Sequence, residues 1–155
     1  MRWLGVVGVL LGLAARASAQ LEQPSVNLLT MSSTMMVTSS ATLYMTPGSG
    51  IDPLESNVAM PLGRKGTFRA LACTTSIATG VGKDIAVTGR VGPCGSLVDT
   101  GAFGCTIAGG ATPGLCTSGT VNLLVSAQQC FSLKVVTPAA LPAAVFVNCT
   151  LERAT

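Results

Sequence analysis

The chain has 155 residues, with nine Lys and Arg, six Asp and Glu, and no histidine. A Ser-His-Asp triad, a Cys-His nucleophile pair and a His-ligated metal all require histidine, so the composition excludes them within this chain. Charged residues make up 10% of the chain and aromatic residues 4%. The remaining mixture of small and β-branched residues favours strands joined by Gly-rich turns over helices.

The first nineteen residues have the three parts of a cleavable secretory signal peptide. Arg2 supplies a positive n-region, residues 4–15 form an apolar h-region, and the small residues of segment 17–19 offer a cleavage site. The apolar run is shorter than the roughly 20 residues that a membrane helix needs. The sequence therefore predicts an exported protein, secreted or held at the cell surface, whose mature chain begins at Gln20.

Removal of the signal peptide changes the charge of the chain. It takes away Arg2 and Arg16 and leaves seven basic residues against six acidic ones. A nearly neutral chain has no polybasic face for nucleic acid or anionic lipid, and the short basic cluster in segment 64–69 is interpreted as a solvated loop. We therefore expect no nucleic-acid partner, no membrane span after cleavage, and no cofactor.

All six cysteines lie between residues 73 and 149. An even count behind a signal peptide predicts disulfides, because the exported compartment is oxidising. No CxxC pair is present, so the spacing does not predict a metal site. Six cysteines allow fifteen pairings, and pairing neighbours along the chain is the simplest hypothesis. That hypothesis joins Cys73 to Cys94, Cys105 to Cys116, and Cys130 to Cys149.

Segment 20–62 is rich in Ser, Thr and Met and lacks cysteine. Its two-residue alternation predicts half-buried strands, with a flexible segment as the alternative. The alternating pairs are Val26 with Leu28, Met35 with Val37, and Leu43 with Met45.

Region 63–155 contains the stronger strand patterns. Candidate strands cover 67–74, 84–91 and 144–151, and residues 120–126 and 130–137 resemble the two arms of a hairpin. Residues 92–119 hold three cysteines among Gly, Thr and Pro, and are expected to form a loop. The whole pattern predicts an all-β chain, a small antiparallel sandwich or barrel stabilised by disulfides, in which 20–62 and 63–155 form one domain.

The last predicted strand contains the glycosylation sequon Asn148-Cys149-Thr150. Strand alternation places Val145, Val147 and Cys149 on one face, and Asn148 on the other. A glycan at Asn148 can then point to solvent while the half-cystine points inward. The sequence thus predicts N-glycosylation at Asn148 in a eukaryotic secretory route.

Residues 96–102, SLVDTGA, include the tripeptide Asp99-Thr100-Gly101. The segment resembles the active-site loop of aspartic proteases, especially the dimeric retroviral type. The resemblance implies that Asp99 is a catalytic aspartate and that Thr100 and Gly101 shape its loop. The chain departs from that family, because it has no second DTG and no supporting pair of hydrophobic residues followed by Gly. Asp-Thr-Gly is also a common turn sequence, and this is the interpretation we favour.

These observations favour a non-enzymatic protein that acts through its surface. We expect a structural, adhesive or recognition protein of an extracellular coat, matrix or assembly, whose partners are other extracellular proteins or copies of itself. An aspartic protease-like dimer that uses Asp99 is the first alternative. The second alternative is a peptide precursor cleaved at Arg64-Lys65, where Gly63 could donate an amide and residues 20–62 would be released.

Overall fold

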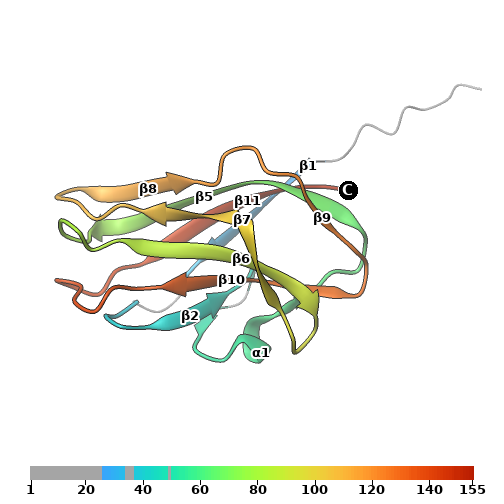
Figure 1. The fold of residues 1–155 in the computed structure, drawn as a ribbon, viewed down its shortest axis with the longest axis horizontal. Helices are drawn as coiled ribbons and strands as arrows, with labels where there is room; N and C mark the ends of the chain where they lie inside the picture. Colours follow the sequence, from blue (N-terminus) through green and yellow to red (C-terminus); the bar gives the residue numbers. More distant parts are fainter. Residues whose placement is uncertain (1–25, 34–36, 49) are drawn as a thin grey trace, which may run out of the picture.

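The computed structural model describes residues 26–33, 37–48 and 50–155. The predicted signal peptide, 1–19, and Met35 lie outside the described residues. Nearly all regular structure is antiparallel β, arranged in two sheets (Figure 1). The all-β prediction is therefore confirmed, and the architecture is a disulfide-stabilised sandwich.

The first sheet has the strand order β1-β11-β5-β8, with β9 also paired to β5. In Figure 1 its strands β1 and β11 lie behind those of the second sheet. Its strands are β1 (Val26–Ser32), β11 (Val147–Ala154), β5 (Gly66–Ala78), β8 (Pro113–Thr117) and β9 (Leu123–Val125).

The second sheet has the order β3-β2-β10-β6-β7, with β4 also paired to β10. The single helix of the described residues, α1 (Glu55–Val58), has four residues, and no described helix is long and apolar enough to span a membrane. The strands are β3 (Ile51–Asp52), β2 (Thr42–Met45), β10 (Gln129–Val136), β6 (Ile85–Pro93), β7 (Val98–Ile107) and β4 (Met60–Pro61).

Strand alternation builds the core between the two sheets. In β11, Cys149 is buried while Asn148 is exposed, as the sequence predicted. Three phenylalanines meet in the middle: the ring centroid of Phe68, from the first sheet, lies 5.9 Å from Phe103 and 4.5 Å from Phe131, both from the second. Aromatic side chains bury large apolar areas, so this trio supplies much of the packing in a chain with few aromatics.

Gly89 in β6 makes room for one of these rings. A Cβ atom at this position would lie 2.5 Å from Cδ1 of Phe103. The pairing of β6 with β7 shifts register between Thr88 and Arg90, around the same glycine. The interruption of the 84–91 pattern by glycine is therefore a packing requirement of the core.

The prediction that residues 92–119 form a loop is wrong. They contain β7 and β8, and Phe103 and Ile107 of β7 are fully buried. The glycines and the Asp-Thr-Gly tripeptide indicated turns, but pairing with β6 outweighs that local preference. Three-dimensional context thus makes strands of a sequence with weak strand propensity.

The hairpin predicted over 120–137 is also wrong. β9 pairs with β5 in the first sheet, whereas β10 pairs with β2 and β6 in the second. The connection between them, where Gln128 has φ 70°, crosses from one sheet to the other. The last strand begins three residues later than predicted, at Val147.

The N-terminal segment forms strands, as its alternation predicts. In β1, however, the apolar pair Val26 and Leu28 faces solvent and not the core. Val26 and Leu28 are 52% and 68% exposed, whereas Met31 is buried. Because strand side chains alternate, it is the odd-numbered residues of β1 that face the core. The apolar Val26 and Leu28 are left on the outside of the sandwich.

The disulfides are nested, the first cysteine joined to the last. The neighbour hypothesis is correct for Cys105–Cys116 and wrong for the other four cysteines. Cys73 and Cys149 are direct cross-strand partners because β11 returns beside β5, and Cys130 lies near Cys94 because β10 pairs with β6. The bonds are Cys73–Cys149, Cys94–Cys130 and Cys105–Cys116.

Removing the disulfides one pair at a time tests this nesting. The sequence separations are 76, 36 and 11 residues for the outer, middle and inner bonds. Because longer closed loops restrict the unfolded chain more, we expect Cys-to-Ala double variants to lose about 4.5, 4 and 3 kcal/mol of unfolding free energy, respectively. Urea unfolding of the oxidised proteins measures the order. The largest loss from removal of Cys105–Cys116 would contradict it.

Candidate functional site

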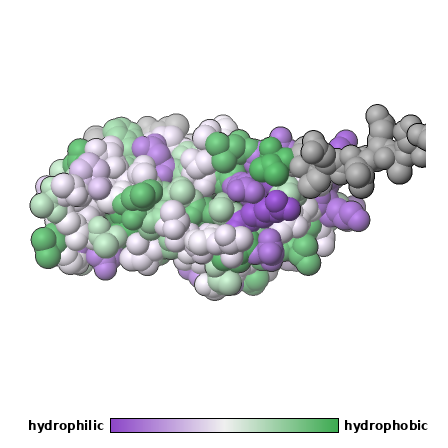
Figure 2. Space-filling model, turned by 90° about the horizontal axis from the view of Figure 1, so that it is seen from above, coloured by the Kyte–Doolittle hydropathy of each residue, from purple (hydrophilic) through white to green (hydrophobic). Residues whose placement is uncertain are grey.

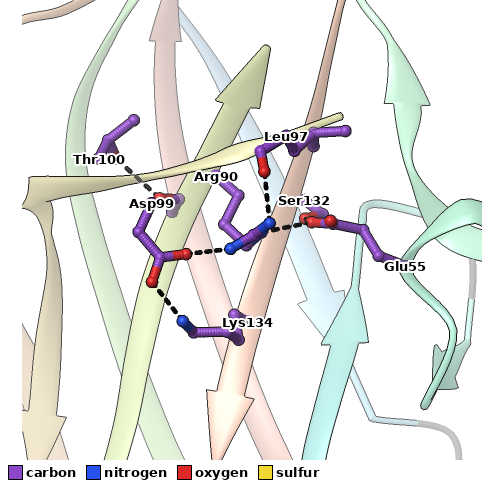
Figure 3. Close-up of polar contacts among 8 residues, drawn as sticks. Glu55, Arg90, Leu97, Asp99, Thr100, Ser132 and Lys134 are labelled. Atoms are coloured by element: carbon purple, nitrogen blue, oxygen red, sulfur yellow. Dashed lines mark hydrogen bonds and ion pairs between the residues drawn. The ribbon is translucent and has the colours of Figure 1, made fainter. Parts of the chain in front are cut away.

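A cluster of charged side chains occupies the outer face of the second sheet (Figure 3). Arg90 comes from β6, Asp99 from β7, Lys134 from β10, and Glu55 from α1. Strand register brings them together, because Arg90 is opposite Asp99 on one side and Ser132 on the other. Their apolar neighbours, such as Leu133, point into the core.

Arg90 is the centre of this cluster. Its Nε donates to Oε1 of Glu55 at 2.7 Å, and its two terminal nitrogens donate to Oδ1 of Asp99 and to the carbonyl oxygen of Leu97. Its Cζ also lies 5.7 Å from the centre of the Tyr44 ring, within cation–π range. With its side chain 17% exposed, the guanidinium is committed to groups of the protein itself.

Asp99 is held as an anion by two cations. Oδ2 accepts from Nζ of Lys134 and Oδ1 accepts from Arg90. The hydrogen bond from Lys134 lowers the pKa of Asp99, with a further lowering from Arg90, and together they outweigh the desolvation that raises it. An aspartic protease needs two carboxylates that share a proton. Here Asp99 faces ammonium and guanidinium groups, and Glu55 lies across the guanidinium, bound also by Ser132.

The residues beside Asp99 do not form a loop. Asp99, Thr100 and Gly101 all lie within β7, so the interpretation of this tripeptide as a turn is wrong. Oγ1 of Thr100 donates to the carbonyl oxygen of Gly89 at 2.7 Å, in the region where the register shifts. The arrangement can join three strands and the helix through ion pairs on a sheet surface.

Sequence reasoning singled out Asp99 and missed its partners Glu55, Arg90 and Lys134. Period-two alternation could have shown that Arg90 faces outward, since its neighbour Val91 faces the core. It could have shown the same for Lys134, since its neighbour Leu133 faces the core. It could not have shown that β6 lies between β7 and β10, because that depends on the pairing of Arg90 with Asp99 and with Ser132, residues that are distant in the sequence.

The core holds a second group of reactive atoms. The sulfurs of Cys73, Cys105 and Cys116 all lie within 4.8 Å of one another. Each belongs to a disulfide, either Cys73–Cys149 or Cys105–Cys116. Thiolates are the usual sulfur ligands of metals, and these sulfurs are bonded in disulfides. In this oxidised state they link strands and are not free to bind a metal.

Two further predicted sites lie on the surface. Asn148 is exposed on β11, and its Oδ1 accepts from Oγ of Ser32 in β1. Arg64 and Lys65 are exposed between β4 and β5, and the carbonyl oxygen of Arg64 accepts from Arg153 at 2.7 Å. The segment that cleavage there would release contributes β1 and β2, one to each sheet.

Comparison with known proteins does not assign this chain to a family. No protein-family model matches it, and no curated protein matches it. Among solved structures, the Eiger TNF from S. frugiperda is similar with a TM-score of 0.40 and 8% identity, over 83% of this chain and 92% of that one. A likeness of this size supports no statement about function.

The charge cluster predicts a pH-dependent contribution to stability. Because the pKa of Asp99 is lowered in the folded state, its contribution is present at neutral pH and is lost as pH falls below about 4. We expect Asp99→Asn to lower the unfolding free energy by up to about 1 kcal/mol at pH 7, since the Asp99 side chain is 41% exposed.

Urea unfolding at pH 7, 5 and 3 measures this contribution. The difference between Asp99→Asn and the parent protein should persist at pH 5 and shrink at pH 3. Glu152→Gln is the control, since its carboxylate reaches Arg69 only at 4.0 Å on the other sheet. A variant more stable than the parent at pH 7 would contradict the prediction, because it would show that the charged Asp99 lowers the stability of the fold.

Proposed function

We propose that the protein is a secreted, non-enzymatic component of an extracellular coat, matrix or assembly, with a structural, adhesive or recognition role. The observation that carries this proposal is the outer face of the first sheet. Across four strands, two adjacent rows of this face offer exposed or half-buried side chains without charge. A broad neutral face of this kind suits contact with other molecules, because burial of its side chains requires no removal of charges from water.

The strand register arranges this neutral face in rows. One row runs Thr30, Thr150, Ala72, Thr117, from β1 through β11 and β5 to β8. The next row runs Ser32, Asn148, Thr74, Leu115. Leu115 is 66% exposed. We call these eight residues the neutral face.

The nearest charged side chain in register, Glu152, lies in the adjacent row, opposite Leu28 and Ala70. Arg69 and Glu152, 4.0 Å apart, occupy the end of the first sheet where β5 pairs with β9. Figure 2, a view from above, shows the largest group of hydrophilic side chains towards the right-hand end, where the C-terminus lies in Figure 1, and a mostly pale and apolar surface with scattered hydrophilic residues elsewhere. The eight residues of the neutral face are thus uncharged, with the nearest charge in register at their border.

The charge cluster supports a non-enzymatic role. The Asp99 carboxylate, the group that the protease resemblance singles out, is ion-paired with Arg90 and Lys134. Its lowered pKa opposes the proton sharing that activates water in that family. Export is supported by the three disulfides, which persist in oxidising compartments.

The proposal is tested with mature protein from Gln20, oxidised and used as bait in the extracellular fraction of its own source. We expect self-association or capture of a specific partner, weakened about tenfold or more by Thr74→Glu, since that change places an unpaired charge on the neutral face. Thr106→Glu, on the outer side of the second sheet, is the matched control and should bind as the parent does.

Two outcomes would overturn this proposal. A monodisperse monomer that captures nothing would remove the assembly role. Proteolysis at acid pH that disappears in Asp99→Asn would replace it with an aspartic protease.

We also propose that Asn148 carries an N-linked glycan. Its exposure and its place in the middle of the second row leave space for a sugar on the solvent side. Occupancy decides whether the neutral face meets its partners as protein or through carbohydrate.

A sequon test separates the glycan from the fold. In eukaryotic secretory expression, we expect Thr150→Ala to abolish the mass increment removed by an N-glycosidase, and Thr150→Ser to keep it, because either hydroxyl completes the sequon. Intact mass spectrometry measures both. An unchanged mass after glycosidase treatment of the parent protein would contradict occupancy.

A further inference from the structure

β1 is the edge strand of the first sheet. It pairs with β11 on one side, and no described strand pairs with its other side. A free edge exposes a row of unpaired backbone N–H and C=O groups, and natural proteins protect such edges with charge, proline, bulges or short length. An edge strand that lacks such protection is therefore the place where a strand of another chain can pair with the sheet.

The other edges carry protection. β8 has five residues, begins with Pro113, and shifts register against β5. β7 carries Asp99 and shifts register against β6. Short length protects the remaining outer strands, since β3 and β4 have two residues each and β9 has three. β1, with the sequence VNLLTMS, has seven residues, no charge, no proline and an unbroken register with β11.

The hydrogen-bond pattern shows which residues of β1 face the open side. The amide of Ser33 donates to the carbonyl oxygen of Val147, 2.9 Å away, and the register continues from this pair into β1. In an antiparallel pair, residues bonded to the neighbouring strand alternate with residues directed away from it. The odd-numbered residues of β1 therefore bond to β11. The even-numbered residues, 26 to 32, direct their N–H and C=O groups outward.

We propose that β1 pairs antiparallel with β1 of a second copy of this chain and joins two first sheets into one continuous sheet. This partner rests on the self-association within the proposed function. A twofold axis at Leu29 places Leu28 opposite Thr30 of the second copy, and Val26 opposite its Ser32. The four even-numbered residues of each strand then form about eight backbone hydrogen bonds.

Side-chain direction fits this register. Paired residues are all even-numbered, so each neutral face continues onto the same side of the joined sheet, whereas a slip of one residue would turn one face inward. Leu28 and Val26, exposed in one copy, gain neighbours across the junction.

Charge also favours a copy of the same chain as the partner. β1 has no charged side chain, and Glu152, the nearest acidic residue in register, lies on β11 opposite Leu28. Across the strands of the joined sheet, Glu152 of β11 lies beside Leu28 of β1. Leu28 lies beside Thr30 of the second copy, which lies beside Thr150 of that copy. No two carboxylates are therefore neighbours across the junction. A surface that is compatible with itself about a twofold axis is what a symmetric dimer requires.

The test uses oxidised mature protein from Gln20 in sedimentation equilibrium, with amide exchange measured by NMR. We expect a dimer whose Leu28 and Thr30 amides exchange about tenfold or more slowly than in dilute monomer. The amides of Leu29 and Met31, bonded to β11, should be protected in both states, which makes them an internal control.

Two variants interrupt the junction in different ways. Thr30→Pro removes an outward N–H and leaves the bonds to β11 in place. Leu28→Lys brings two ammonium groups to diagonal positions about 7–8 Å apart. Both should yield monomers, whereas Val81→Lys, at a turn residue that is 85% exposed, should remain dimeric.

A monomeric parent protein at about 100 µM would overturn the edge pairing, as would a dimer unaffected by both variants. Slow exchange of the Leu28 and Thr30 amides at every concentration would overturn it as well. If the copies stay apart but a different extracellular partner is captured, the edge pairing fails while the proposed function stands. If nothing associates at all, both fail.

Discussion

One row of half-cystines links the strands and the two sheets of this protein covalently. Cys73 on β5 lies in register between Cys149 on β11 and Cys116 on β8, and is bonded to Cys149. Cys116 is bonded in turn to Cys105 on β7, in the other sheet. These two bonds tie four strands together at one level of the core and connect the two sheets covalently. With aromatic residues at 4% of the chain, such links replace packing that a larger aromatic core would provide.

The covalent core has a consequence for the surfaces. Because the buried core and the disulfides hold the two sheets together, the two outer faces can differ in composition. The second sheet places opposite charges in mutual contact around Arg90. The first sheet displays rows of Thr, Ser, Asn and Ala. One face satisfies its own charges, and the other remains available to a partner, which is the physical basis of the recognition role proposed for this chain.

The sequence was sufficient where local periodicity carried the information. Ile85, Val87 and Val91 are buried on one side of β6, and Asn148 and Cys149 point in opposite directions, as alternation predicts. It was insufficient where distant segments decide the outcome. Asp-Thr-Gly indicates a turn locally, yet pairing with β6 makes it part of a strand. The cysteine pairs and the partners of Asp99 likewise depend on strand order, which no local pattern contains.

If the proposed role is correct, the protein contacts its partners through the first sheet and not through the charge cluster. Hydroxyl-radical footprinting of the protein in its native assembly, against the purified monomer or its edge-blocked form, tests this most directly. We expect Leu28 and Leu115, on the first sheet, to become protected, while Tyr44 and Val136, on the second, react as before. Protection confined to Tyr44 and Val136, with Leu28 and Leu115 unchanged, would contradict it.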